Sequence, residues 1–330
     1  MTNPHQPPPA QPPRRGWGCL LLALTPAVML VLMALWLFQG TDEGVGAMQV
    51  VVESAPEGVS RTVVIVDAKG VMMGGRRRQP GALSGDLHRV LDAIEDDDTV
   101  VGLLLRLDTP GGSVTDADVL HHRLTDLKAG GTKVLVHMGD LCASGGVYLA
   151  AAADEIWALP TTVTGSIGVI INTLNVSALM ERVGVADTSV TSGPHKQLLS
   201  PTRPPSEADR AILKNIVDEM YTRFVQVVAD GRKWEGEAGL ARVRALADGR
   251  LYSAQQAVDA GLVDAVGYSE AAQARLEAMV GGPVRVVRYS VRRGLFEMLA
   301  GHLDGAPFEG LEAALQGPRA LYMVGPGLRW

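Results

Sequence analysis

Cysteine is scarce in this chain of 330 residues, and the scarcity excludes a scaffold held by disulfides. The two cysteines are Cys19, at the start of an apolar run, and Cys142, deep in the chain, so no bridge between them is expected. A basic stripe with interleaved aromatic residues is also missing, and we therefore expect no nucleic-acid partner. The composition, 47% hydrophobic and 20% charged, does permit a packed core.

Charge is absent from residues 17–38. As a helix this run would be roughly 33 Å long, enough to cross the hydrocarbon core of a bilayer. Arg14 and Arg15 precede it, and the charged residues that follow it are acidic up to Arg61. The positive-inside rule then predicts a single-pass anchor in the cell (inner) membrane, with the N-terminus in the cytoplasm and the rest of the chain outside.

A cleaved signal peptide is the alternative reading of this run, although the apolar core of a signal peptide is usually shorter. Small residues that could form a cleavage site follow the run at Gly44, Gly46 and Ala47. A buried core helix is disfavoured because the run is apolar on every face.

The composition divides the chain into five segments. The first sixteen residues include six prolines and predict an extended tail. The predicted segments are the Pro-rich cytoplasmic tail 1–16, the transmembrane anchor 17–38, a linker 39–60, the main folded domain 61–290 and a C-terminal extension 291–330.

The pattern of the main domain predicts an α/β fold. Short apolar runs typical of buried strands alternate with amphipathic segments typical of helices, which implies a largely parallel sheet with right-handed crossovers. The expected strands are 62–66, 100–107, 133–138, 155–159 and 166–171, and the expected helices begin near residues 84, 116, 144 and 206. The last of these helices opens with a capping box at Ser206 and Asp209, and its apolar stripe predicts core or a subunit interface.

Two glycine-containing turns could carry chemistry. Gly111 and Gly112 follow a buried strand, where backbone N–H groups can face a developing oxyanion. Ser144 stands before Gly145 at the start of a predicted helix, so its hydroxyl would have free N–H groups beside it. Each signal alone is weak, because such turns also serve purely conformational ends and serine is an ordinary helix cap.

A serine nucleophile needs a base, and the residues alone leave the choice open. The Gly-x-Ser-x-Gly motif is absent, since Cys142 stands two positions before Ser144. His137 and His195 have no evident carboxylate partner in the sequence. Lys196 could act only if its surroundings lower its pKa enough to leave the amine neutral.

These pieces occur together in one family. From Leu104 to about Asp264 the chain resembles the signal peptide peptidase A family of bacterial membrane serine proteases. The anchor predicted above agrees with the short form of that family. The matching stretches are 105–112 (LRLDTPGG), 138–140 (MGD), 143–146 (ASGG), 164–169 (TGSIGV), 192–196 (SGPHK), 200–201 (SP), 249–250 (GR) and 261–264 (GLVD).

The resemblance implies a Clp protease/crotonase-like fold with an N-terminal transmembrane helix, and 61–290 would be the protease domain. It implies that Ser144 is the nucleophile, that Lys196 is its general base, and that Ser166 orients the lysine. The reaction would be acyl transfer through an acyl-enzyme, with no metal or other cofactor.

The resemblance also implies an oxyanion hole made by the backbone N–H of Gly111 or Gly112 with that of Gly145. Two positions depart from the family pattern, since Gln197 stands where an acid is common and Cys142 where alanine is expected. Neither departure removes a catalytic group.

The implied partners are peptides and further copies of the chain. Short members of the family form homo-oligomeric rings in which neighbouring subunits supply the serine and the lysine of one site. The implied substrates are signal-peptide remnants and other membrane-derived peptides. Two alternatives stay open: a crotonase-type acyl-CoA enzyme, which needs no Ser–Lys pair, and a catalytically degenerate membrane-bound oligomeric scaffold.

Overall fold

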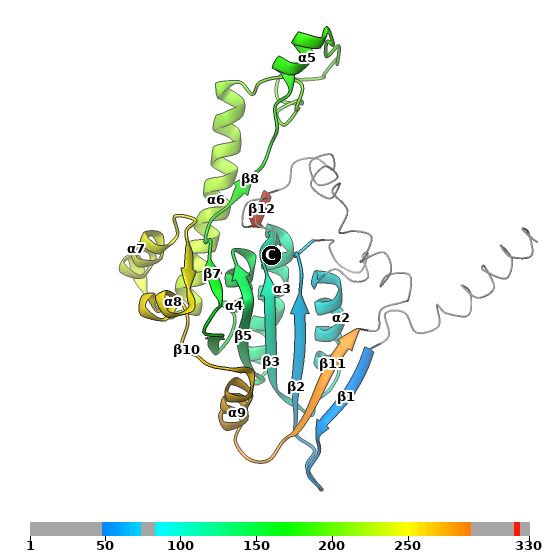
Figure 1. Ribbon diagram of the computed structural model, residues 1–330, viewed down its shortest axis with the longest axis vertical. Helices are drawn as coiled ribbons and strands as arrows, with labels where there is room; N and C mark the ends of the chain where they lie inside the picture. The colour runs from blue at the N-terminus through cyan, green and yellow to red at the C-terminus, as the bar shows by residue number, and fades with distance from the viewer. Residues whose placement is uncertain (1–47, 74–82, 292–319, 324–330) are drawn as a thin grey trace, which may run out of the picture. The chain divides into compact units, whose positions relative to one another are not determined.

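The computed structural model describes residues 48–73, 83–291 and 320–323, which belong to one compact unit (Figure 1). In these ranges no helix is both long and apolar enough to cross a membrane. The tail 1–16 and the anchor 17–38 lie outside the described residues, so both stay predictions.

A mixed α/β architecture is confirmed. The main sheet has nine strands among the described residues, and the central strands β2, β3, β5 and β6 are parallel, as predicted. Its order is β1 (Met48–Ser54), β11 (Arg285–Val291), β2 (Thr62–Lys69), β3 (Val100–Thr109), β5 (Lys133–Ala143), β6 (Glu155–Ala158) and β10 (Ala265–Val266), with β7 (Val163–Gly165) paired to β5 and β9 (Leu251–Ser253) paired to β7.

The core lies on both faces of this sheet, which explains the nearly continuous apolar runs of β2, β3 and β5. On one face Val64, Leu103 and their neighbours pack with helices α2 (Leu83–Glu95), α3 (Val114–Ala129) and α4 (Gly145–Ala150). On the other face Ile65 and Leu104 pack with α9 (Ser269–Val280). The remaining helices are α5 (Ser177–Val183), α6 (Glu207–Gly231), α7 (Gly236–Leu246) and α8 (Ala254–Ala260).

The prediction of a strand over 166–171 is wrong for residues 166–169, which belong to no strand. The main-sheet strand β7 ends before this range, at Gly165, and only β8 (Ile170–Ile171), which belongs to a second sheet, falls within it. The difference follows from the backbone, because Gly165 and Ser166 both have a positive φ, of 91° and 52°, which ends an extended strand.

The second sheet has the order β4 (Gly111–Ser113), β12 (Ala320–Met323), β8, and both of its pairings are antiparallel. Strand β12 comes from the predicted C-terminal extension. Likewise, β1 lies within the predicted linker 39–60 and pairs with β11 at the edge of the main sheet. Segments from both ends of the described chain thus join the fold.

Residues 172–206 and the first half of α6 form an arm, defined here as residues 172–220. In Figure 1 the arm extends beyond the carboxyl ends of the parallel strands. The second half of α6 is buried through Phe224, Val225 and Val228, whereas Ile212 and Ile216 are exposed. The predicted apolar stripe of this helix is therefore core only in its second half.

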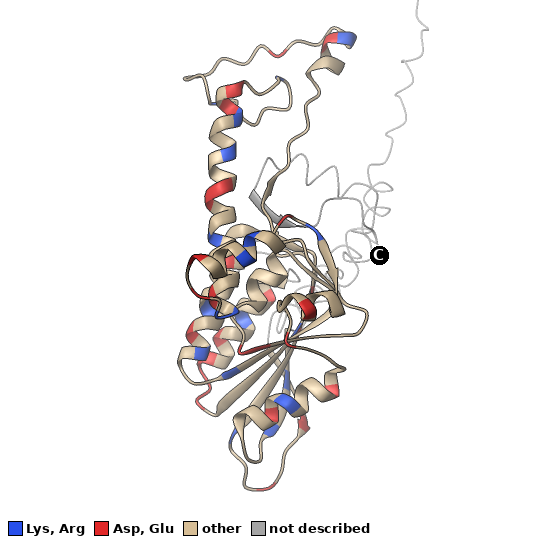
Figure 2. Cartoon of the chain, turned by 90° about the vertical axis from the view of Figure 1, so that its left-hand side faces the viewer, with Lys and Arg blue, Asp and Glu red and all other residues tan. Residues whose placement is uncertain are grey.

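The arm exposes apolar side chains beside the charged residues of α5 and α6 that Figure 2 colours. Leu179 and Val183 of α5 are 61% and 64% exposed, and Val190 is 98% exposed. Apolar surface of this kind is typical of a site of association.

Candidate active site

Ser144 occupies a sharp turn between β5 and α4. Its φ and ψ are 55° and −110°, a conformation that a residue with a side chain adopts only under strain. The turn is held because the N–H of Ser144 donates to the carbonyl of Gly165 at 2.8 Å. The geometry is that of a nucleophile elbow, although the sequence lacks the usual motif.

The hydroxyl of Ser144 is unused. The residue is 1% exposed, and its Oγ has no hydrogen-bond partner within the described part of the chain. Buried hydroxyls normally find a partner, and exceptions often mark reactive groups. The arrangement fits a reactive side chain whose partner does not lie among the described residues.

The glycines after Ser144 permit close packing. A Cβ on Gly146 would lie 2.8 Å from Cγ2 of Thr109 and 2.9 Å from Sγ of Cys142. A Cβ on Gly145 would lie 3.3 Å from Cα of Gly111. Residues without side chains therefore let the start of α4 lie against the turn after β3. Burial raises the pKa of the Cys142 thiol, so this residue is an inert packing group beneath the elbow.

The backbone of β4 favours Gly112 over Gly111 as an oxyanion donor. The N–H of Gly111 already donates to Oγ1 of Thr109 at 3.1 Å. The carbonyl of Gly111 accepts from Met72 at 2.9 Å, and the N–H of Ser113 donates to Met72 at 2.7 Å. Backbone groups of successive residues in a strand point to opposite sides, so the N–H of Gly112 faces away from Met72, on the side where β12 pairs with β4.

Gly145 and Gly112 meet at this point, since a Cβ on Gly145 would lie 3.4 Å from the nitrogen of Gly112. Two backbone donors next to a buried serine are the elements that an oxyanion hole requires.

Strand β12 lies directly beside these glycines. Its Tyr322 is paired with Gly112, and its Leu321 is paired with Ser113 on β4 and with Ile170 on β8. An extended chain therefore fits between β4 and β8 next to the elbow, with backbone pairing on both sides.

Ser166 is linked to Ser144 through the backbone. It directly follows Gly165, whose carbonyl accepts the N–H of Ser144, and its own N–H donates to the carbonyl of Arg250 at 2.7 Å. The side chain of Ser166 is half-buried. The structure thus brings Ser144, Gly112, Gly145 and Ser166 into one region.

Lys196 lies elsewhere in the chain, on the arm. It is exposed in a turn where its N–H donates to the carbonyl of Gly193 at 3.2 Å. Because the Oγ of Ser144 has no partner within the described residues, the structure does not bring Lys196 into hydrogen-bonding contact with it.

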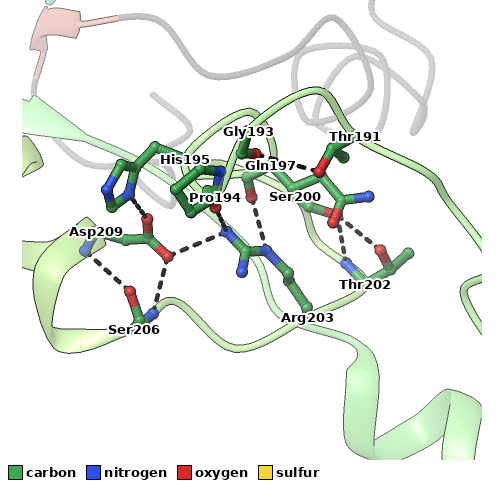
Figure 3. A network of polar contacts seen from close by, with 10 residues as sticks. All are labelled: Thr191, Gly193, Pro194, His195, Gln197, Ser200, Thr202, Arg203, Ser206 and Asp209. Atoms are coloured by element: carbon green, nitrogen blue, oxygen red, sulfur yellow. Dashed lines mark hydrogen bonds and ion pairs between the residues drawn. The ribbon is translucent and has the colours of Figure 1, made fainter.

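Asp209 is the residue that the sequence analysis missed as a partner of His195. His195 Nδ1 lies 2.8 Å from Oδ1 of Asp209, at the start of α6, and Figure 3 draws this contact as a dashed line. The hydrogen bond from His195, followed by those from Ser206, lowers the pKa of the Asp209 carboxyl to about 2. The capping box in the sequence correctly predicts that Asp209 lies in the first turn of its helix. Its contact with His195 is visible only in the folded structure.

Comparisons with known proteins agree with the resemblance seen in the sequence. A profile of peptidase family S49 matches residues 126–281, which include Ser144 and Lys196. The chain is 41% identical over 180 residues to an Enterococcus faecium protein named for signal peptide peptidase SppA; the match covers 54% of this chain and 51% of that protein. It is 38% identical over 200 residues to a Synechocystis sp. protein named as protease slr0021, covering 60% of this chain and 70% of that protein.

Among solved structures, the fold is similar to a ClpP1 mutant from Listeria monocytogenes, with 17% identity and a TM-score of 0.40, covering 64% of this chain and 94% of that one. The chain belongs to peptidase family S49. It spans about half the length of the Enterococcus relative.

Proposed function

We propose that this chain is a serine endopeptidase in which Ser144 attacks the peptide carbonyl and Lys196 is the general base. One observation carries the proposal: a buried serine on a strained elbow, with an unused hydroxyl, lies beside the backbone of Gly112 and Gly145. Membership of family S49 supports the same reaction class.

The reaction proceeds in two halves. Neutral Lys196 takes the proton of Ser144 as Oγ attacks the carbonyl, and the N–H groups of Gly112 and Gly145 stabilise the oxyanion. The intermediate collapses, the leaving amine takes the proton from the lysine, and an acyl-enzyme remains. Water then attacks the ester with Lys196 again as base, which releases the acid and restores Ser144.

The lysine comes from a neighbouring subunit of a homo-oligomeric ring. Two observations support this: Ser144 has no hydrogen-bond partner within the described residues, and the arm that carries Lys196 exposes apolar side chains. Association of the arms would cover that surface and bring each Lys196 to the Ser144 of another copy.

The substrate is an extended peptide that adds a strand between β4 and β8, in the position that β12 occupies. Signal-peptide remnants and other membrane-derived peptides suit this site, since the anchor 17–38 would hold the catalytic domain at the outer face of the cell membrane. The finer fold class in this proposal is a Clp protease/crotonase-like domain with an N-terminal transmembrane helix.

Hydrolysis of a fluorogenic peptide by the full chain in detergent tests this function. We expect Ser144→Ala and Lys196→Ala each to reduce kcat by at least about 10³-fold, because each removes a group that acts in the transition state. Near-normal activity in Lys196→Ala would reject the lysine as base. Oligomer size and thermal unfolding serve as controls that both variants still fold.

Labelling with a fluorophosphonate separates the alternatives. Labelling that is lost in Ser144→Ala supports a serine peptidase, because the probe reports an activated serine. A crotonase-type acyl-CoA enzyme or a degenerate scaffold would leave the wild type unlabelled.

A further inference from the structure

The turn that carries Lys196 is tied to one buried carboxylate. Asp209 is 1% exposed, and its Oδ2 accepts from Nη2 of Arg203 at 3.1 Å and from the N–H of Ser206 at 3.0 Å. Its Oδ1 is bonded to Nδ1 of His195. The donors come from both sides of Lys196 in the sequence, so a single side chain closes the whole loop onto the start of α6 (Figure 3).

Arg203 also holds the backbone on either side of Lys196. Its Nε donates to the carbonyl of Gln197 at 3.2 Å and its Nη2 to the carbonyl of Pro194 at 3.4 Å. Lys196 lies between these two residues, and its neighbour His195 is held by Asp209. The backbone on both sides of the lysine is therefore fixed although its own side chain is exposed.

The charges in this cluster favour the closed loop. An ionised Asp209 facing Arg203 makes a charge-assisted hydrogen bond, which is stronger than a neutral one. Because Nδ1 of His195 donates to this carboxylate, the neutral ring keeps its other nitrogen, Nε2, as an acceptor. His195 thus shares the carboxylate–imidazole arrangement found in catalytic bases. A role as a base must therefore be distinguished from a role in holding the turn that carries Lys196.

We propose that His195 and Asp209 are positioning residues that hold the Lys196 turn on the end of α6, so that the lysine is presented to Ser144 of a neighbouring subunit. The inference rests on the function proposed above. Misplacement of a catalytic group by about 1 Å can cost about 100-fold in rate, so an anchored turn matters for a base carried by an otherwise exposed loop.

Replacement of His195 by asparagine distinguishes positioning from proton transfer. The asparagine amide nitrogen can take the place of Nδ1 and donate to Asp209, but it cannot act as a base. In the full chain we expect His195→Asn to keep kcat within about 3-fold of wild type. His195→Ala and Asp209→Asn should lower kcat about 10- to 100-fold with KM little changed, because the turn is released while the peptide-binding strands are untouched.

Matched controls exclude simple loss of structure. His122→Ala removes an exposed histidine of α3, and Asp230→Asn removes an exposed carboxylate of α6 outside the arm; both should leave kcat unchanged. Ser206→Ala removes the hydroxyl that accepts the N–H of Asp209 at 3.1 Å but leaves the bond to His195. It should lower the thermal midpoint, as loss of a helix cap does, without a comparable fall in kcat.

Each outcome decides the question. If His195→Asn is as inactive as His195→Ala, the imidazole itself takes part in the chemistry and the positioning role is overturned. If both His195 variants and Asp209→Asn keep wild-type kcat while Ser144→Ala and Lys196→Ala are inactive, the inference fails but the proposed peptidase stands. If Ser144→Ala or Lys196→Ala remains active, the proposed function itself fails.

Discussion

Strain at a single residue distinguishes the candidate nucleophile. Three non-glycine residues among those described have a positive φ, and two of them, Ser144 and Ser166, lie on either side of the Gly165 contact that holds the elbow. Such conformations cost about 1–3 kcal/mol each and persist where the surroundings impose them. The concentration of two of them here fits a site shaped for reaction rather than for stability.

Glycine at position 144 should relieve this strain. We expect Ser144→Gly to have a free energy of unfolding about 1 kcal/mol higher than Ser144→Ala, because glycine adopts φ 55° and ψ −110° without steric cost. Both variants lack the nucleophile, so catalysis does not confound the comparison. Chemical denaturation in matched detergent measures the difference, and an alanine variant as stable as the glycine variant would argue against strain.

At the scale of elements, the proposed peptide substrate would take the strand position that β12 occupies. Strand β12 pairs with β4 beside Gly112 and with β8 on its other side. A tethered strand acts at a high effective concentration, so the chain should oppose binding of its own substrates.

Removal of residues 320–330 should therefore lower KM for a peptide substrate by about 3- to 10-fold, with kcat little changed. Removal of residues 324–330 alone keeps β12 and serves as the control, for which we expect no change in KM. Steady-state kinetics on the two truncated chains provide the test. Equal KM values in both would show that β12 does not occupy the substrate position.

At the scale of the whole molecule, the proposed function makes activity a property of an assembly, because the structure does not bring Lys196 into hydrogen-bonding contact with Ser144. The serine lies at the elbow after β5 and the lysine on the arm, which exposes apolar side chains such as Leu179. A site shared between subunits predicts that two inactive variants can restore each other.

Co-expression of Ser144→Ala with Lys196→Ala should yield mixed rings with about a quarter of wild-type activity, since an intact serine then meets an intact lysine at a quarter of the interfaces when the variants mix equally. Distinct affinity tags on the two chains allow mixed rings to be isolated before the assay. Mixed rings without activity would place both groups of a site in one chain.

The sequence alone determined the α/β class, the parallel central strands and the candidate elbow, because these follow from local features: apolar runs, capping residues and glycines at turns. It also determined family membership, through motifs spread over the main domain. Local patterns carry this information since each depends on residues a few positions apart.

Tertiary structure decided the rest. Only the fold places Gly165 against Ser144, Asp209 against His195 and β12 against β4, because each contact joins segments separated along the chain. Only the fold also shows that the N–H of Gly111 is engaged within its own turn by Thr109, whereas Gly112 is paired with β12, in the position proposed for the substrate. The sequence identifies the residues that can react, whereas the tertiary structure decides which of them come into contact.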